Sequence, residues 1–267
     1  MNKKEEAYVL IIVLIIAAVV SILSLYFTYY IQREYEIIRT QQDKIREKFK
    51  IIGIESIIKN QVEKKATEKL KKDSLTKGDL IEFKKIINNY DNEINLSQEQ
   101  YVYQIKEVFD LNARVNLNQA NKKDLKLLPG IGETLSKRIV DNRSYNQLNE
   151  LKRLKGVGEA TVNDIKSLVT LSGTEKININ TANDLAWEII NQSLDFKLND
   201  YISSNKVYSD LEELLTAIDE KEEEKINKLK TKGQQLIKFN SDLIGIKYEI
   251  INLKNEDKFS GEKIIEF

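Results

Sequence analysis

The spacing of hydrophobic residues changes along the sequence, and in the first third of the chain it predicts a single helix. Residues 7–31 are uncharged and mostly apolar. From residue 32 to about residue 72, apolar residues recur at helical spacing among charged ones. The recurring positions are Ile38, Ile45, Phe49, Ile52 and Ile57. No Pro or Gly interrupts residues 7–52, so we predict one long helix with Gly53 as its first potential break.

The uncharged run is long enough to cross a bilayer. A spanning helix needs ~20 apolar residues, and residues 7–31 exceed that length. The run ends in aromatic residues suited to the membrane interface, including Tyr26 and Tyr30. It is too long for a signal-peptide core, and no small-x-small cleavage site follows it. We predict a cytoplasmic stub at 1–6, a transmembrane segment at 7–31, and a helical continuation outside the membrane at 32–74.

The pattern changes to short elements after residue 75. Lys77-Gly78-Asp79 predicts a turn, residues 80–90 a short helix and residues 91–98 a loop. Residues 101–109 alternate apolar and polar side chains like a half-buried strand. The tail alternates in the same way, and we expect two or three tail strands to pair with 101–109. The predicted sheet is therefore built from two distant segments, 75–114 and 235–267.

Between these segments one motif is written twice. Val115-Asn-Leu-Asn-Gln-Ala120 opens the first copy, and Ile177-Asn-Ile-Asn-Thr-Ala182 opens the second. In the first copy, Asn118 or Asn121 is the expected helix N-cap. The predicted helices are 122–128, 133–142, 147–155 and 159–170 in the first copy, and 182–192, 195–203 and 208–218 in the second. We assign one helical unit to 115–171, a degenerate second unit to 176–218, and a charged connector, as a solvated helix or linker, to 219–234.

The first unit contains two glycine turns, Leu128-Pro-Gly-Ile-Gly132 and Leu154-Lys-Gly-Val-Gly158. An apolar-Gly-apolar-Gly turn between two short helices is a helix-hairpin-helix element, whose amides can hold a phosphate at a helix N-terminus. The second unit reads Asn191-Gln-Ser-Leu194 where such a turn belongs. The candidate phosphate-binding residues are Gly130, Ile131, Gly132, Lys137, Arg138, Lys152, Lys155, Gly156, Val157 and Gly158. Only Tyr145 lies nearby for base stacking, so the expected ligand is duplex DNA, bound without sequence specificity.

An alternative interpretation makes both glycine turns structural corners. Glu133 and Glu159 follow the second glycine of each turn and would cap the amides that a phosphate needs. The charge balance leaves both interpretations open. The whole chain holds 42 basic and 42 acidic residues, but residues 114–170 carry a net charge of +5 and residues 171–267 one of −6.

The composition argues against catalysis. The chain contains no Cys and no His, which excludes thiolate nucleophiles, disulfides, Cys/His zinc sites and imidazole acid–base chemistry. The remaining polar residues form no catalytic arrangement, so we predict no enzyme, no catalytic residue and no cofactor. Calcium binding by the exposed acids of 171–224 stays open, although no Asp-x-Asp-x-Gly loop is present. Trp187 is expected in the core of the second unit.

The helix-hairpin-helix segment resembles one known family. Residues 115–170, with their Asn-x-Asn-x-Ala opening and two Gly-x-Gly turns, resemble the DNA-binding domain of competence DNA-uptake receptors, which are single-pass membrane proteins. This resemblance implies a receptor for incoming duplex DNA. It leaves the strand before the unit and the β-rich tail unexplained.

The order of the whole chain resembles a second family, the K-type minor pseudopilins of type II secretion. These proteins have a pilin-like N-terminal helix, then a small sheet interrupted by helical domains that begin with Asn-x-Asn-Thr-Ala, then strands that complete the sheet. The resemblance implies a non-enzymatic tip subunit in the inner membrane, with most of the chain outside the cytoplasm. Other minor pseudopilins would be its partners through the N-terminal helix. Secreted cargo would meet the head, which is the part of the chain from residue 75 onward.

A prepilin peptidase site is harder to place. The nearest candidate is the Ala7–Tyr8 bond, which lacks the usual preceding glycine. Cleavage there would put Ile12 at the fifth position, where major pilins carry Glu. K-type pseudopilins also lack that Glu.

The sequence therefore predicts a membrane-anchored α+β protein. It has a long pilin-like helix, a small antiparallel sheet and inserted helix-hairpin-helix/SAM-like units. The predicted function is that of a minor pseudopilin in a type II secretion or type IV pilus-like machine. A competence DNA receptor is the alternative, and a tip subunit that binds DNA within a competence pilus would combine the two. The β-rich tail favours the pseudopilin, because a DNA receptor alone does not need it.

Overall fold

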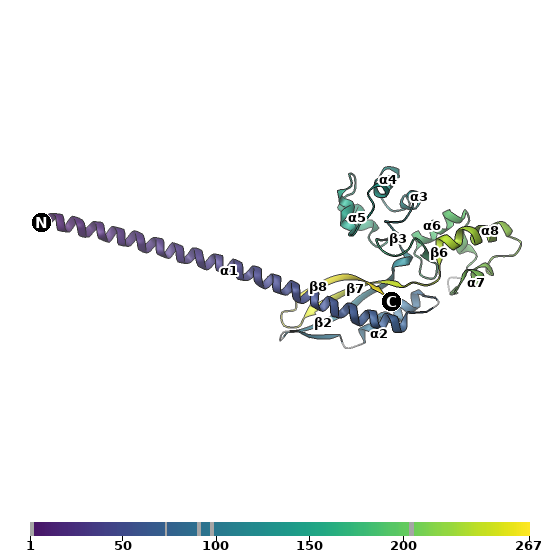
Figure 1. Ribbon diagram of the computed structural model, residues 1–267, viewed down its shortest axis with the longest axis horizontal. Helices are drawn as coiled ribbons and strands as arrows, with labels where there is room; N and C mark the ends of the chain where they lie inside the picture. Colours follow the sequence, from purple (N-terminus) through teal and green to yellow (C-terminus); the bar gives the residue numbers. More distant parts are fainter. Residues whose placement is uncertain (1–2, 73, 90–91, 97–98, 203–205) are drawn as a thin grey trace. The chain divides into compact units, whose positions relative to one another are not determined.

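The computed structural model describes residues 3–72, 74–89, 92–96, 99–202 and 206–267, with side chains from residue 11 onward. Its elements are shown in Figure 1. One helix, α1 (Lys3–Lys69), accounts for the first quarter of the chain. It runs through Gly53 without a break, because an isolated glycine is tolerated in a helix. The chain divides into two compact units, residues 1–56 and 57–267.

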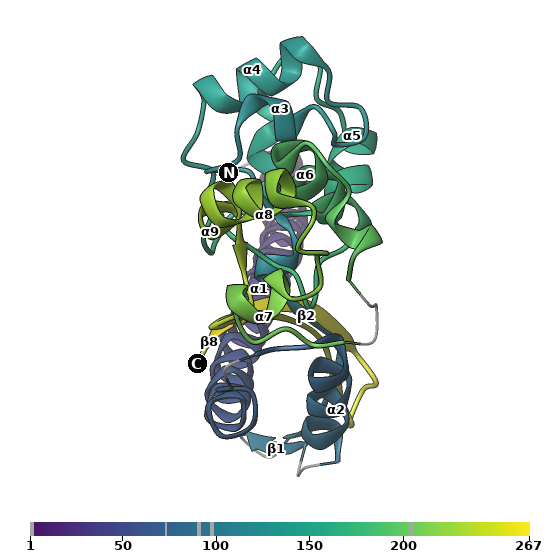
Figure 2. The same ribbon diagram turned by 90° about the vertical axis from the view of Figure 1, so that its right-hand side faces the viewer.

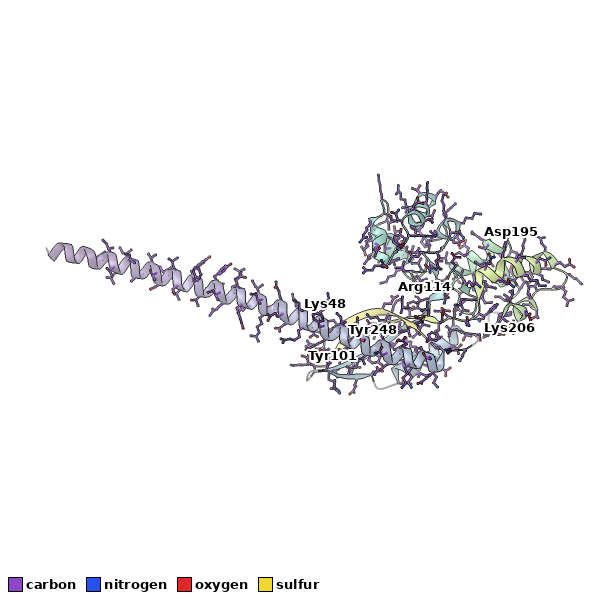
Figure 3. The ribbon with its side chains drawn as sticks, in the orientation of Figure 1. Lys48, Tyr101, Arg114, Asp195, Lys206 and Tyr248 are labelled. Atoms are coloured by element: carbon purple, nitrogen blue, oxygen red, sulfur yellow. The ribbon has the colours of Figure 1, made fainter. Side chains whose placement is uncertain are left out.

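The second unit is built on a four-stranded antiparallel sheet in the order β1-β2-β7-β8. β2 (Glu99–Asp110) pairs with β7 (Leu243–Asn252), which pairs with β8 (Lys258–Glu266). The predicted strand at 101–109 is confirmed, as is its pairing with the tail. Tyr101 and Tyr248 are among the largest buried side chains in this sheet (Figure 3).

Residues 57–69 of α1 and the helix α2 (Lys77–Asn88) cover one face of the sheet (Figure 2). Ile58, Val62 and Ala66 recur every four residues and are fully buried, as an amphipathic helix requires. The Asn88 side chain fixes α2 to the central strand, because it donates to the Ile105 carbonyl (2.9 Å) and accepts from the Ile105 amide (2.8 Å).

Two predictions in this region are wrong. Lys77-Gly78-Asp79 is the first turn of α2, because Thr76 and Asp79 form a reciprocal capping box that starts the helix there. The predicted loop at 91–98 contains the edge strand β1 (Glu93–Leu96), which pairs with β2. A strand of four residues with one buried side chain, Ile94, has too short an alternation to recognise.

The two helical units share one plan. In the first, β3 (Val115–Asn116) pairs in parallel with β4 (Val169–Thr170); in the second, β5 (Ile177–Asn178) pairs in parallel with β6 (Ile237–Lys238). β6 is therefore a tail strand that joins the second unit instead of the main sheet. The helices between these strands are α3 (Lys122–Leu125), α4 (Glu133–Asp141), η2 (Leu148–Arg153) and α5 (Glu159–Ile165) in the first unit, and α6 (Asp184–Leu194), η3 (Leu198–Asp200), α7 (Leu211–Leu215), α8 (Glu223–Lys228), η4 (Leu229–Gly233) and α9 (Gln234–Leu236) in the second.

Several helices are shorter than predicted. The predicted helices at 147–155 and 195–203 are the short 3₁₀ segments η2 and η3; residue 203 of the latter lies outside the described part of the chain. In the segment 219–234, α8 and the π-helical turn η4 follow one another, and Leu229 is fully buried. Leu229 belongs to one hydrophobic core that continues through both helical units, from Val115 to Ile237.

The second Asn of each motif closes its unit. The Asn118 amide donates to the carbonyls of Tyr145 and Leu171, both at 3.0 Å, and accepts from the Tyr145 amide at 2.9 Å. Asn180 makes the same three bonds, to the Tyr208 and Phe239 carbonyls and from the Tyr208 amide. The repeated motif is therefore a pair of equivalent structural ties.

Candidate functional site

Both glycine turns of the first unit adopt the same backbone geometry. Gly130 and Gly156 have φ angles of +72° and +98°, a region that favours glycine because it lacks a Cβ. The second glycine of each turn is an N-cap: Gly132 starts α4 and Gly158 starts α5, and neither helix has a side-chain cap. A Cβ at Gly132 or Gly158 would meet nothing within 4 Å. The helix N-termini therefore open onto unoccupied space.

The two turns lie against each other within the unit. A Cβ at Gly130 would touch Thr161 of α5 at 3.7 Å, and one at Gly156 would touch Leu135 of α4 at 3.3 Å. Arg138 of α4 also donates to the Lys155 carbonyl in the other turn. A helix of each hairpin thus packs on the turn of the other hairpin. This packing places the two candidate phosphate-binding turns next to each other.

The residue between the two glycines is structural in each turn. The Ile131 and Val157 side chains are buried in the core. Their amides donate back to the carbonyls of Leu128 and Leu154, both at 3.0 Å. Amides committed in this way cannot also bind a phosphate, so the uncapped amides at the starts of α4 and α5 are the donors that stay available.

The basic residues around the turns divide into paired and unpaired groups. Lys152 pairs with Glu159, and the Arg138 guanidinium is held by the Lys155 carbonyl. Among the described residues, no ion pair involves the Lys137 or Lys155 ammonium group. Within the part of the chain that the structure describes, these two ammonium groups and the uncapped amides are therefore the members of the predicted site without an ion-pair or capping partner.

Glu133 has a different role from the one expected from its position. The sequence suggested that it caps the amides of α4, but it makes no cap. Its carboxylate pairs with Lys122 and with Lys126, the latter at 2.7 Å. These two lysines lower the pKa of Glu133 to about 2. Glu133 therefore competes with a phosphate for basic side chains, and its pairing with α3 is the contact that sequence reasoning missed.

The described residues of the second unit contain no equivalent turn. Asp195, the residue that caps the end of α6, adopts a left-handed conformation with φ of +60°. The Asn191 side chain closes the turn by accepting from the Leu198 amide at 2.8 Å. The expectation that this turn lacks a glycine cradle agrees with its geometry. Trp187 is partly buried against the core of this unit.

The described acidic residues do not gather into a metal site. No group of three or more His, Cys, Asp or Glu residues that could hold a metal ion occurs in the part of the chain that the structure describes. The acids of 171–224 are instead dispersed, and several pair with lysines, as Asp195 does with Lys228 at 3.2 Å.

One described helix is long and apolar enough to span a membrane, and it belongs to α1. The candidate cleavage position, Ala7–Tyr8, lies in the stretch of α1 whose side chains are outside the described residues. Beyond residue 31, α1 carries a second apolar feature. Isoleucine recurs every seventh residue, and Tyr35 and Phe49 lie beside this row. We call the set Ile31, Tyr35, Ile38, Ile45, Phe49 and Ile52 the apolar seam; each of its side chains is between 48% and 69% exposed.

Comparison with known proteins bears first on the fold. The chain is similar, at a TM-score of 0.55 and 16% identity, to a chain in the crystal structure of the GspK–GspI–GspJ complex of the type 2 secretion system of enterotoxigenic Escherichia coli. The likeness covers 86% of this chain and 93% of that one. The fold is pseudopilin-like. The predicted combination of long helix, small antiparallel sheet and helical units is thereby confirmed.

Two further comparisons concern the first helical unit. A family model described as a helix-hairpin-helix motif matches residues 111–170, which confirms that motif within the pseudopilin-like fold. A deoxyribonuclease of Thioalkalivibrio sp. is 36% identical over 53 residues, which are 20% of this chain and 15% of that protein. The chain thus spans a small part of that relative's length.

Proposed function

We propose that this protein is a K-type minor pseudopilin, a non-enzymatic tip subunit of a type II secretion or type IV pilus-like machine. It is anchored in the inner membrane by residues 7–31, with the bulk of the chain outside the cytoplasm. Its partners are other minor pseudopilins, which it meets through α1, while the head contacts cargo. The pseudopilin-like fold over most of the chain supports this proposal.

The observation that carries the proposal is the apolar seam. A membrane explains the exposed apolar residues of 11–31, but the seam continues for about three helical heptads into water. Burying one Ile side chain contributes roughly 1.5–3 kcal/mol, so a row of exposed isoleucines favours association. Apolar residues that repeat every seven positions line the contact surface between two long helices that pack side by side. Packing of α1 against the N-terminal helices of other subunits accounts for both the exposure of the seam and its seven-residue repeat.

Site-directed crosslinking tests this assembly directly. The chain has no Cys, so Ile45→Cys introduces a unique thiol that can carry a benzophenone crosslinker in native membranes. We expect covalent adducts with the N-terminal helix of another anchored pilin-like subunit. Thr40→Cys, on the opposite face of α1, is the matched control and should give few such adducts. Equal adducts from both positions, or adducts with lipid alone, would count against the proposal.

A second candidate function, non-specific binding of duplex DNA, is favoured by the two intact glycine turns. Both retain the left-handed first glycine and the uncapped helix start, and Lys137 and Lys155 supply free positive charge beside them. Contacts of this kind reach only the phosphate backbone, so affinity would fall steeply with salt. A competence receptor, or a pilus tip that holds DNA, would use them.

The Gly132→Asp/Gly158→Asp double variant separates the two candidates. Asp is a favourable N-cap and both positions have room for it, so the fold should keep or gain a few tenths of a kcal/mol. Its carboxylates would occupy the phosphate positions. If the turns bind DNA, full-length protein in detergent should bind random duplex DNA in a fluorescence-anisotropy titration at low salt, and the double variant should not. Absence of binding by the unmodified protein at low salt would leave the turns as structural corners.

A further inference from the structure

The four-stranded sheet ends in a long edge strand, β8. β8 is nine residues long and pairs with β7 in a continuous register, without the irregularity that β2 shows between Ile105 and Glu107. Within the described residues β7 is its sole neighbour, so its other edge is open. The opposite edge strand, β1, has four residues. A long straight edge is the kind that accepts another strand.

The hydrogen-bond phase of β8 shows which backbone groups face outward. The Phe267 amide donates to the Asp242 carbonyl at 3.0 Å, and at the other end of the hairpin the Asn252 amide donates to the Asp257 carbonyl at 3.0 Å. In an antiparallel pair, hydrogen-bonded and non-hydrogen-bonded residues alternate. Both ends give the same phase. The residues whose amides and carbonyls point away from β7 are Lys258, Ser260, Glu262, Ile264 and Glu266, and all five are exposed.

The side chains across the sheet define the charge that an added strand would need. Glu107, Lys247 and Glu262 are cross-strand neighbours on β2, β7 and β8. Lys247 is paired with Glu107, so the alternation of sign ends at Glu262 on the open edge. Glu266 lies on the same face of β8, with the exposed Ile264 between the two acids. Opposite charges on neighbouring strands stabilise a sheet, whereas like charges oppose pairing.

We propose that the open edge of β8 binds an extended segment of another protein as a fifth strand. The segment carries Lys or Arg opposite Glu262 and Glu266 and an apolar residue opposite Ile264. The backbone bonds supply affinity, and the two acids select a basic strand, as in other cases of strand addition. The charges on β8 also discourage uncharged or acidic edges. This inference is independent of the function proposed for α1 and the glycine turns.

A synthetic peptide tests the proposal on the full chain. The probe is a fluorescein-labelled nonapeptide, Lys-Val-Val-Thr-Arg-Val-Thr-Val-Glu, compared with the same peptide carrying Glu in place of Lys and Arg. We expect the basic peptide to bind at least tenfold more tightly in an anisotropy titration. Its binding should slow hydrogen exchange at the outward-facing amides of β8.

Two variants separate the edge from general charge effects. Glu262→Lys should weaken the basic peptide at least tenfold and improve binding of the acidic one. Glu256→Lys makes the same charge change in the turn between β7 and β8 and should leave both affinities within twofold. Equal binding of the two peptides, or indifference to Glu262→Lys, would overturn the proposal. Self-association in sedimentation that Glu262→Lys abolishes would also overturn it, in favour of a second copy of this chain.

Discussion

One glycine in the sheet is required by the aromatic ring beside it. Phe109 and Gly245 are cross-strand partners on β2 and β7, and a Cβ on Gly245 would lie 2.1 Å from the Phe109 ring. The ring is in turn covered by the Arg114 guanidinium, 3.5 Å from its centre. Glycine is therefore needed at position 245 because the Phe109 ring leaves no room for a Cβ, and not because the backbone is left-handed.

We expect Gly245→Ala to destabilise the protein by about 1–3 kcal/mol, because the Phe109 ring must leave its place. Urea unfolding of the full chain in detergent would measure the loss. The double variant Gly245→Ala/Phe109→Leu should recover part of it, since a smaller side chain makes room for the new methyl group. If the double variant is no more stable than Gly245→Ala, the steric explanation fails.

Asp124 is one residue whose environment makes stability depend on pH. Burial, with a smaller contribution from Glu175, raises its pKa from 3.8 to about 6. A carboxyl with a raised folded-state pKa destabilises the fold once it ionises. Stability should therefore decline as pH rises from about 4 through 6, by roughly 1–2 kcal/mol after allowance for partial exposure.

Asp124→Asn should remove this pH dependence. Urea unfolding at pH 4 and pH 7 would compare the two proteins, and the difference between the two pH values should shrink in the variant. A matched substitution at the exposed Asp141 should leave the wild-type difference intact. An unchanged pH dependence in Asp124→Asn would show that another group is responsible.

At the scale of elements, the two Asn ties are the features most open to a direct test. Asn118→Ala leaves the Tyr145 and Leu171 carbonyls without their shared donor, and Asn180→Ala does the same to Tyr208 and Phe239. Each orphaned group costs about 1–3 kcal/mol. We expect both variants to lose about 2–4 kcal/mol in urea unfolding, whereas Ala at the exposed Asn146 should change stability by less than about 0.5 kcal/mol. A loss at one tie alone would mean that the units are not equivalent.

The elements that could be predicted are those with a repeating pattern. The apolar run, the alternation at 101–109 and the twice-written motif each carried enough residues to fix an element. β1 and the first turn of α2 depend on four residues and on a local cap, Thr76 with Asp79. The second unit held a further signal: Tyr145-x-x-Leu-x-Glu-Leu151 recurs as Tyr208-x-x-Leu-x-Glu-Leu214. Those tyrosines are the partners of the two Asn ties.

The candidate site was predictable in its turns and not in its ion pairs. The Gly-x-Gly pattern specifies a backbone geometry, which the structure shows at Gly130 and Gly156. The pairing of Glu133 with Lys122 and Lys126 depends on how α3 packs beside α4, and no spacing in the sequence encodes that. The open edge of β8 likewise depends on the strand order, which long-range pairing decides.

At the scale of the folded head, one buried acid connects the sheet to the second helical unit. Asp110 ends β2 and is 2% exposed. Its carboxylate accepts from the Asn178 amide at 2.8 Å and from the Thr181 hydroxyl at 2.6 Å. It also accepts from the backbone amide of Asn112 at 2.8 Å. A single side chain thus satisfies donors from the start of the second helical unit and from the backbone just after β2, and this shared acceptor should couple the unfolding of the second unit to that of the sheet.

The chain's single tryptophan makes that coupling measurable. Trp187 lies in the second unit and reports its unfolding by fluorescence, while far-UV circular dichroism reports the whole chain. In the unmodified protein the two urea transitions should coincide. Asp110→Ala removes the carboxylate that accepts from three buried donors, so the Trp187 transition should move to lower urea and separate from the circular dichroism transition. Asp141→Ala, at an exposed position, should keep the transitions together. Coincident transitions in Asp110→Ala would mean that the shared core, and not this carboxylate, holds the head together.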